Sequence, residues 1–223
     1  MDNLYRTIIY DQRYLLILDG LKNTLIITIG ATILGVIIGL IIALIKNNYK
    51  ENKKYKFLNI LANLYVTVIR GTPALLQLMI IYYIIFKTST INILFIGILA
   101  FGINSGAYVS EIFRTGIESI DKGQMEAGKS LGLSYSQIMR YIILPQAIKN
   151  AMPALGNEFV TLIKETSVAG YIGIRDLTKA GDIIASRTYD YFLPLIITAI
   201  IYLTLTLGIT KLLKKFERRN NNA

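Results

Sequence analysis

Six polar side chains interrupt stretches of this sequence that are otherwise apolar, and they are the first candidates for chemistry. They are Gln77, Asn104, Ser105, Tyr108, Glu158 and Thr161. The carboxylate of Glu158 can accept an ammonium or guanidinium group, and the amides and hydroxyls can donate or accept hydrogen bonds. Because polar groups in an apolar environment are costly, such residues usually mark function. The set can therefore supply hydrogen-bond donors, acceptors and one negative charge to a small polar molecule.

Helical spacing places these candidates in small groups. Thr161 lies one turn beyond Glu158 on the same face, and Asn104 and Tyr108 stand four residues apart. Gln77 follows a proline that bends its helix and leaves nearby carbonyl groups unpaired. The helices that carry these residues must therefore meet around one polar region.

Several candidates also have a structural interpretation. Glu158 could instead form an internal ion pair with Arg70 or Lys164, and Tyr108 could simply pack as an aromatic ring. Arg70 lies near the middle of its apolar stretch. We interpret Arg70 as structural, with a carboxylate contact as the alternative.

The composition excludes several classes of protein. The 223 residues include no His and no Cys, which excludes a disulfide framework, a thiol nucleophile, a zinc site built from these residues and a His-based proton relay. We therefore expect neither catalytic nor metal-binding residues. A hydrophobic fraction of 53% is too high for disorder and for a soluble domain of this size. The net charge of +10 is not spread over a polar surface, as binding to nucleic acid would require.

Windows of about 20 apolar residues predict an all-α integral membrane protein with five transmembrane helices. The predicted spans are residues 21–44, 57–86, 91–112, 152–174 and 192–213. They belong to one membrane domain, residues 21–215, preceded by an interfacial segment, residues 1–20, and followed by a tail, residues 216–223. The second span is longer than a straight crossing needs, and Pro73 is expected to bend it. Gly35 and Gly39 predict a close approach between helices.

The charges predict the orientation of these spans. One side of the predicted membrane holds 15 Lys and Arg and six Asp and Glu, a net charge of +9. The other side holds eight basic and seven acidic residues, a net charge of +1. By the positive-inside rule the N-terminus lies outside and the C-terminus in the cytoplasm, which an odd number of spans requires. We expect the protein in the cell membrane.

The segment from Gly123 to Ser130 matches the P-loop pattern G-x-x-x-x-G-K-[ST], which would indicate a nucleotide-binding protein. A P-loop needs a buried strand that delivers the glycine-rich loop to a helix N-terminus. No continuous apolar strand precedes Gly123, and Asp19, the nearest Walker-B-like acid, lies across the predicted membrane from Lys129. A P-loop protein is therefore the weaker alternative, and a passive membrane channel is the other.

The same segment gives a more informative match in another frame. Glu126, Ala127, Gly128 and Gly132 are followed at fixed spacing by Leu144 and Pro145. This pattern resembles the E-A-A-x3-G-x9-I-x-L-P loop of ABC-importer permease subunits, with Gly128 in place of the second alanine. The spacing predicts a cytoplasmic loop over residues 122–147, with a short helix that Gly132 stops and a second helix, residues 136–143, that Pro145 ends.

The resemblance covers residues 16–219 and is specific to the polar amino-acid branch of these permeases. The matching segments are Arg70-Gly-Thr-Pro-Ala-Leu-Leu-Gln77, Ala107-Tyr-Val-Ser-Glu-Ile-Phe-Arg114, Lys122-Gly-Gln124, Asn157-Glu158 and Lys164-Glu-Thr-Ser167. The resemblance implies the type I ABC-importer permease fold and transport of a polar, and in one reading basic, amino acid. It also implies a substrate site in the region of Glu158.

The resemblance further implies the partners. They are a cytoplasmic ABC ATPase dimer, an extracytoplasmic amino-acid-binding protein and a second permease chain, identical or similar. The lipid bilayer surrounds the chain, and nucleic acid is not a partner. ATP would be hydrolysed by the ATPase partner, so this chain is expected to be no enzyme and to hold no cofactor.

Overall fold

The computed structural model describes residues 4–53 and 55–221, and helices make up every regular element in these ranges. In chain order they are η1 (Tyr5–Ile9), η2 (Tyr10–Gln12), α2 (Tyr14–Asn52), α3 (Lys56–Arg70), α4 (Ala74–Ile80), η3 (Ile81–Ile85), α5 (Ile93–Glu118), α6 (Lys122–Ser130), α7 (Tyr135–Ile138), η4 (Met139–Ile143), α8 (Leu144–Glu165), η5 (Thr166–Ile172), α9 (Leu177–Thr188) and α10 (Phe192–Asn221).

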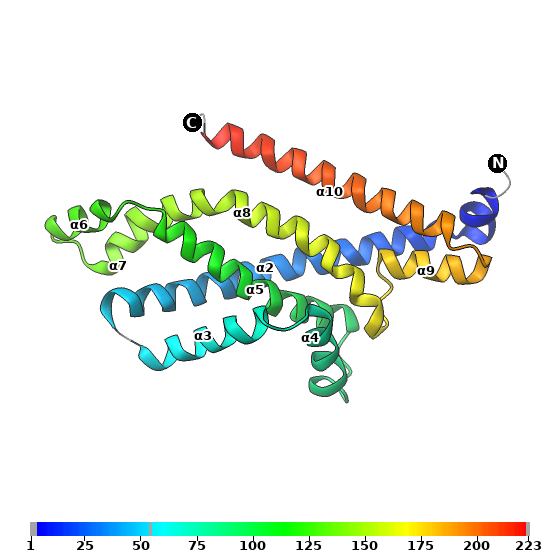
Figure 1. Ribbon diagram of the computed structural model, residues 1–223, viewed down its shortest axis with the longest axis horizontal. Helices are drawn as coiled ribbons and strands as arrows, with labels where there is room; N and C mark the ends of the chain where they lie inside the picture. Colours follow the sequence, from blue (N-terminus) through cyan, green and yellow to red (C-terminus); the bar gives the residue numbers. More distant parts are fainter. Residues whose placement is uncertain (1–3, 54, 222–223) are drawn as a thin grey trace.

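Helices α2, α5 and α8 lie side by side along the long axis of the molecule (Figure 1). Helices α6 and α7 form one end, and α9 with the first residues forms the other. Helix α10 packs on α9 near its start and on α8 further along, where Leu213 lies against Gly156. The all-helical architecture predicted from the sequence is thus confirmed for the described residues.

Glycines allow α2 and α5 to pack closely. A Cβ atom on Gly39 would lie 2.5 Å from Cγ1 of Val109, and one on Gly35 would lie 3.0 Å from Cβ of Ser105. From the other side, Gly102 faces Leu34 in the same way. Small residues let helix backbones approach where hydrocarbon surrounds them. The predicted role of the two α2 glycines is confirmed.

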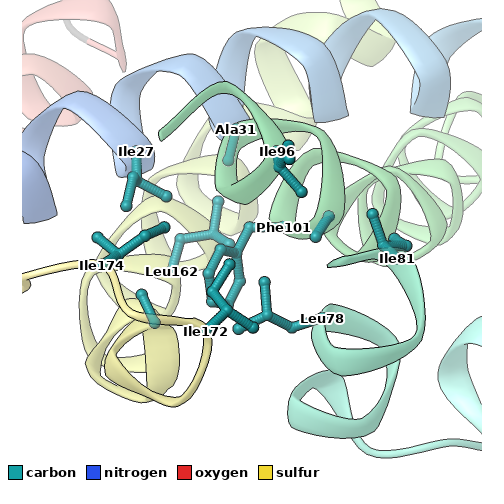
Figure 2. Packing of buried hydrophobic residues seen from close by; sticks show 11 residues of the cluster. Ile27, Ala31, Leu78, Ile81, Ile96, Phe101, Leu162, Ile172 and Ile174 are labelled. Atoms are coloured by element: carbon teal, nitrogen blue, oxygen red, sulfur yellow. The ribbon is translucent and has the colours of Figure 1, made fainter. Parts of the chain in front are cut away.

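The main apolar core lies where α2, α4, η3, α5, α8 and η5 meet (Figure 2). Ile27 of α2, Phe101 of α5, Leu78 of α4 and Leu162 of α8 are each buried in it. Ile172, in η5, packs against the same cluster. The core therefore fixes the short helix α4 against the α2, α5 and α8 bundle, next to the predicted polar region.

The predicted second span is broken rather than bent. Helices α3 and α4 with η3 meet at an angle of 109° across residues 71–73. The ring of Pro73 disfavours a helical backbone at Thr72, and Pro73 itself is extended, with φ −63° and ψ 136°. The bend predicted at Pro73 is therefore confirmed, whereas its angle, which the sequence did not specify, is large enough to break the helix in two.

The expectation for Pro145 was wrong, because this proline does not end a helix. Residues 135–165 are helical throughout, and Pro145 lies in the first turn of α8. A proline ring clashes with the carbonyl group four residues earlier, here that of Tyr141. Tyr141 lies in the π-helical turn η4, whose wider backbone relieves this clash.

Other boundaries differ from the predicted ones. Helix α2 begins at Tyr14, before the predicted start of the first span, and it follows a break at Asp11 with φ 58°. The predicted fourth span combines most of α8 with η5. By length and apolar composition, three helices of the described chain could cross a membrane, or four with the broken pair, and α8 is not among them.

Candidate functional site

Helix α5 and helix α8 meet at a polar contact between two predicted site residues. The hydroxyl of Ser105 donates a hydrogen bond to Oε1 of Glu158, with a length of 2.8 Å. Ser105 is buried opposite Gly35, and Glu158 is half-buried. Within the described residues, no cation lies within 4.0 Å of the Glu158 carboxylate, so neither Arg70 nor Lys164 pairs with it.

A second contact joins α4 to α5 through two amides. Nδ2 of Asn104 donates to Oε1 of Gln77 at 2.9 Å. Nε2 of Gln77 donates in turn to the carbonyl groups of Ile69 and Thr72 and to the Thr72 hydroxyl, at 2.8, 3.1 and 2.7 Å. Gln77 thus bonds to carbonyl groups beside the break in the chain, a use of its amide that the sequence did not predict. Both amides are buried, and Oδ1 of Asn104 has no hydrogen-bond partner.

A third contact joins α3 to α5. The guanidinium of Arg70 lies over the ring of Tyr108, with its Cζ atom 5.3 Å from the ring centroid. Tyr108 is half-buried and Arg70 is exposed. Thr161 is half-buried on α8, one turn from Glu158. The structure therefore arranges the predicted residues around α5, which contacts side chains of α3, α4 and α8 within about one and a half turns.

The loop predicted to couple to an ATPase is a compact helical hairpin. Helix α6 starts after Asp121, whose Oδ1 accepts a hydrogen bond from the Gly123 amide. It ends at Gly132, which has φ +75°. The amide of Gly132 donates to the Lys129 carbonyl and that of Leu133 to the Gly128 carbonyl, which is the Schellman pattern. The prediction that Gly132 stops this helix is confirmed.

One departure from the family pattern has a steric reason. Gly128 is buried against α7, and a Cβ atom there would lie 2.8 Å from Cγ1 of Ile138. An alanine at this position would require the Ile138 side chain to shift. Glu126, Ala127 and Pro145 are exposed and Leu144 is half-buried, so most of the loop pattern is available to a partner.

The helical conformation of α6 also weakens the P-loop alternative. Residues 123–130 lie within the helix, so most of their amide groups are used in internal hydrogen bonds rather than turned toward a phosphate. A cavity of about 460 Å³ lies behind α6, with Lys50, Glu118 and Lys129 among its lining residues.

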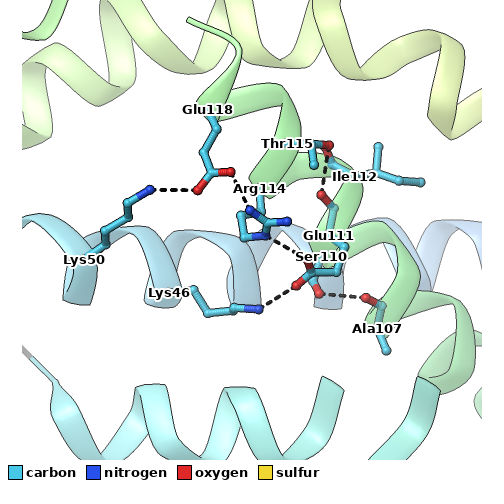
Figure 3. Close-up of polar contacts among 9 residues, drawn as sticks. All are labelled: Lys46, Lys50, Ala107, Ser110, Glu111, Ile112, Arg114, Thr115 and Glu118. Atoms are coloured by element: carbon cyan, nitrogen blue, oxygen red, sulfur yellow. Dashed lines mark hydrogen bonds and ion pairs between the residues drawn. The ribbon is translucent and has the colours of Figure 1, made fainter. Parts of the chain in front are cut away.

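Sequence reasoning missed a chain of ion pairs between α2 and α5 (Figure 3). Lys46 bonds to Glu111 at 2.6 Å and Lys50 to Glu118 at 2.8 Å, while Arg114 bonds to both glutamates. Glu111 and Arg114 stand in a matched motif, but nothing in the sequence pairs Glu111 with a lysine 65 residues away or Glu118 with one 68 residues away. The ion pairs join the end of α5 that precedes α6 firmly to α2.

A second cavity, of about 410 Å³, lies between η5, α9 and α10 at the opposite end of the molecule. Asp176 lines it and caps α9, accepting hydrogen bonds from the amides of Thr178 and Lys179. Burial raises the pKa of the Asp176 carboxyl from 3.8 to about 6. Because folding favours the protonated form, the stabilising contribution of this group is lost as the pH rises through about 6.

Comparison with known proteins matches nearly the whole chain to one family of transport proteins. A family model described as "Binding-protein-dependent transport system inner membrane component" matches residues 16–222. A Rickettsia prowazekii (strain Madrid E) protein assigned as the glutamine transport system permease GlnP is 42% identical over 214 residues, 94% of this chain and 95% of its own length. The arginine transport system permease ArtQ of Bacillus subtilis (strain 168) is 43% identical over 161 residues, 71% of this chain and 74% of its own.

Solved structures extend the comparison to the fold. The structure titled "Crystal structure of an amino acid ABC transporter with histidines" contains a chain with a TM-score of 0.83 and 48% identity, covering 92% of this chain and 94% of that one. An inward-facing structure of the MetNI methionine ABC transporter has a TM-score of 0.78 at 20% identity, covering 92% of this chain and 96% of its own, which supports the fold alone.

Proposed function

The chain belongs to the family of binding-protein-dependent transport system inner membrane components, and on this premise we propose that it carries a polar amino acid between α5 and α8. As an amino-acid permease subunit of an ABC importer, it is a multi-pass protein of the cell membrane and is not itself an enzyme. The observation that carries the proposal is the Ser105–Glu158 contact, which holds a carboxylate at the interface of two helices without a cation.

The proposed topology has five crossings, with the N-terminus outside and the C-terminus in the cytoplasm. The broken pair α3 and α4 forms the second crossing, and α8 with η5 forms the fourth. Support comes from the distribution of basic residues, which leaves α6 and α7 on the positively charged side. Residues 21–215 form the permease domain in this proposal, and residues 1–20 and 216–223 flank it.

The proposed substrate contacts centre on Glu158. Its carboxylate suits the α-ammonium group of any amino acid, and also the side-chain cation of a basic one. Ser105 and Thr161 flank it as hydroxyl groups. Gln77, Asn104 and Tyr108 complete the proposed lining, and the free Oδ1 atom of Asn104 is the one amide acceptor there that internal bonds leave open.

Coupling to ATP hydrolysis is proposed at the hairpin of α6 and α7. The residues assigned to the ATPase dimer are Glu126, Ala127, Gly128, Gly132, Leu144 and Pro145. ATPase closure would move α6, and α5 would follow together with α2, because the Lys46 and Lys50 ion pairs join them. Helix α8 would move relative to this pair and open the polar region to one side of the membrane at a time.

The remaining partners are assigned to other surfaces. An amino-acid-binding protein would dock on the outer end, formed by residues 6–22, Lys87 and residues 170–191. Because five crossings are few to enclose a path, a second permease chain, identical or similar, would complete it.

The test is uptake into proteoliposomes by the complex of permease, ATPase and binding protein. Glu158→Gln is expected to lower uptake at least ~10-fold while the complex still assembles. The change removes from the site the negative charge that would bind the positively charged group of the substrate. Glu165→Gln, the same change two turns along α8, is the matched control and is expected to keep most of the uptake. Unchanged uptake in Glu158→Gln would remove this residue from the site, and uptake by the permease without its ATPase would indicate a passive channel.

A further inference from the structure

Arg70 is a charged residue whose partner is missing from the described chain. It ends α3, near the middle of the proposed second crossing. Its guanidinium contacts the ring of Tyr108, but no carboxylate of the described residues lies within 4.0 Å of it. A cation inside a membrane protein is normally paired or aimed at a water-filled path. Arg70 is exposed in the described chain, so its guanidinium is available to an anion from outside these residues.

The backbone around Arg70 is held firmly. Nε2 of Gln77 bonds to the carbonyl groups of Ile69 and Thr72, which lie on either side of Arg70 and Gly71. Gly71 in turn donates to the carbonyl group of Thr67. The break between α3 and α4 thus presents the Arg70 side chain from a fixed position.

The side chains of Arg70 and Glu158 both contact α5, at positions close to each other. Tyr108 contacts the guanidinium, and Ser105 contacts the Glu158 carboxylate. Ser105 and Tyr108 are three residues apart on α5, so they are neighbours on its surface, with Cβ atoms about 5–6 Å apart. The guanidinium of α3 and the carboxylate of α8 therefore contact side chains at neighbouring positions of α5, yet they do not pair with each other.

We propose that Arg70 binds the α-carboxylate of the transported amino acid while Glu158 binds its ammonium group. This inference rests on the proposed function and deepens it, because it assigns the recognition of the amino-acid head group. A guanidinium fits a carboxylate with two parallel hydrogen bonds, and the two charges of an amino acid are separated by a single carbon atom. The substrate would neutralise both unpaired charges at once.

The proposal makes the site selective for the head group rather than for the side chain. An amine that lacks the α-carboxylate would leave Arg70 unpaired, and a site built around a polar group rejects analogues without it. The site would therefore separate L-arginine from agmatine, and L-glutamine from 4-aminobutanamide, although each pair shares its remaining atoms.

The experiment measures competition in proteoliposomes that contain the complete complex. The readout is the ratio of the inhibition constants of the decarboxylated amine and its amino acid, for both pairs. We expect a ratio of ~100 or more in the wild type and below ~5 in Arg70→Met, because only the amino acid loses a contact. Arg70→Lys, which keeps the charge but not the paired hydrogen bonds, should lie between them. Lys164→Met, an exposed cation removed from α8, is the matched control and should keep the wild-type ratio.

A structural role of Arg70 would lower all uptake and leave the ratio unchanged, and that result would overturn the proposal. So would an unchanged ratio in Arg70→Lys, which decides the question if Arg70→Met does not assemble. Wild-type complex that takes up no amino acid would instead refute the proposed function, and this inference with it.

Discussion

Helices α5 and α10 have similar lengths and both are apolar enough to cross a membrane, but they are used in opposite ways. In the most apolar stretch of α5, 61% of the residues are buried, against 11% in α10. Helix α5 buries Asn104, Ser105 and Ser110, whereas α10 exposes leucines and isoleucines along most of its length. Hydropathy alone therefore identifies a membrane helix, and small and polar residues show which one lies at the centre.

The glycines of the two regions show the same contrast. A Cβ atom added to Gly39 of α2, facing α5, would lie 2.8 Å from the backbone nitrogen of Ser110. A Cβ atom added to Gly208 of α10 would meet nothing within 4 Å. The first glycine is required by a close helix contact, and the second lies on an open surface.

The largest expected effect comes from filling the contact between α2 and α5. Gly39→Val should lower the free energy of unfolding by ~3 kcal/mol or more, because the added side chain meets Val109 and the backbone of α5. Gly208→Val is the matched control and should change it by less than ~1 kcal/mol. Unfolding in mixed detergent micelles, followed by circular dichroism, measures both. Equal losses in the two variants would break the comparison.

A smaller effect is expected from the ion pairs that fasten α2 to α5. The Lys46–Glu111 pair is mostly buried, with side-chain exposures of 16% and 19%, whereas those of Lys50 and Glu118 are 61% and 37%. Lys46→Met should cost ~2 kcal/mol, less than a fully unpaired buried charge because Arg114 still bonds to Glu111. Lys50→Met should cost ~0.5 kcal/mol, as exposed pairs do.

The same unfolding measurement tests the difference between Lys46→Met and Lys50→Met. A transport assay then tests whether the ion pairs also serve coupling. If the ion pairs make α2 move together with α5, Lys46→Met should also raise ATP hydrolysis per amino acid transported. A variant that is destabilised but fully coupled would show that the pairs serve stability alone.

The residues of the candidate site could be chosen from the sequence, but their relations could not. Polar side chains in apolar stretches identified Ser105 and Glu158, since a buried polar group needs a reason. Their hydrogen bond joins residues 53 positions apart, and no local pattern encodes such a pairing. Pro73 predicted unpaired carbonyl groups near Gln77, but neither the 109° break nor the bonds from Gln77 to those carbonyl groups were predicted.

Local sequence rules predicted the backbone correctly where one residue sets its conformation, and they failed where the conformation also depends on neighbouring residues. Gly132 stops α6 because a positive φ suits glycine, whatever lies around it. Pro145 was expected to end a helix by the same kind of rule, yet the π-helical turn before it accommodates the ring. The sequence contains no separate signal for that turn.

The smallest expected effect lies on the exposed face of α10. Leu203 and Leu207 are 57% and 51% exposed, so Leu→Ala at either position removes few protein contacts and should change the free energy of unfolding by less than ~0.5 kcal/mol. Leu162→Ala, in the core next to α5, is the matched control and should cost ~2–5 kcal/mol. Losses on α10 that approach the Leu162 value would mean that this face is packed rather than open. If a second chain covers α10, such losses of unfolding free energy are expected in the assembled permease and not in the monomer. A difference between the two measurements would then place the contact between chains on α10.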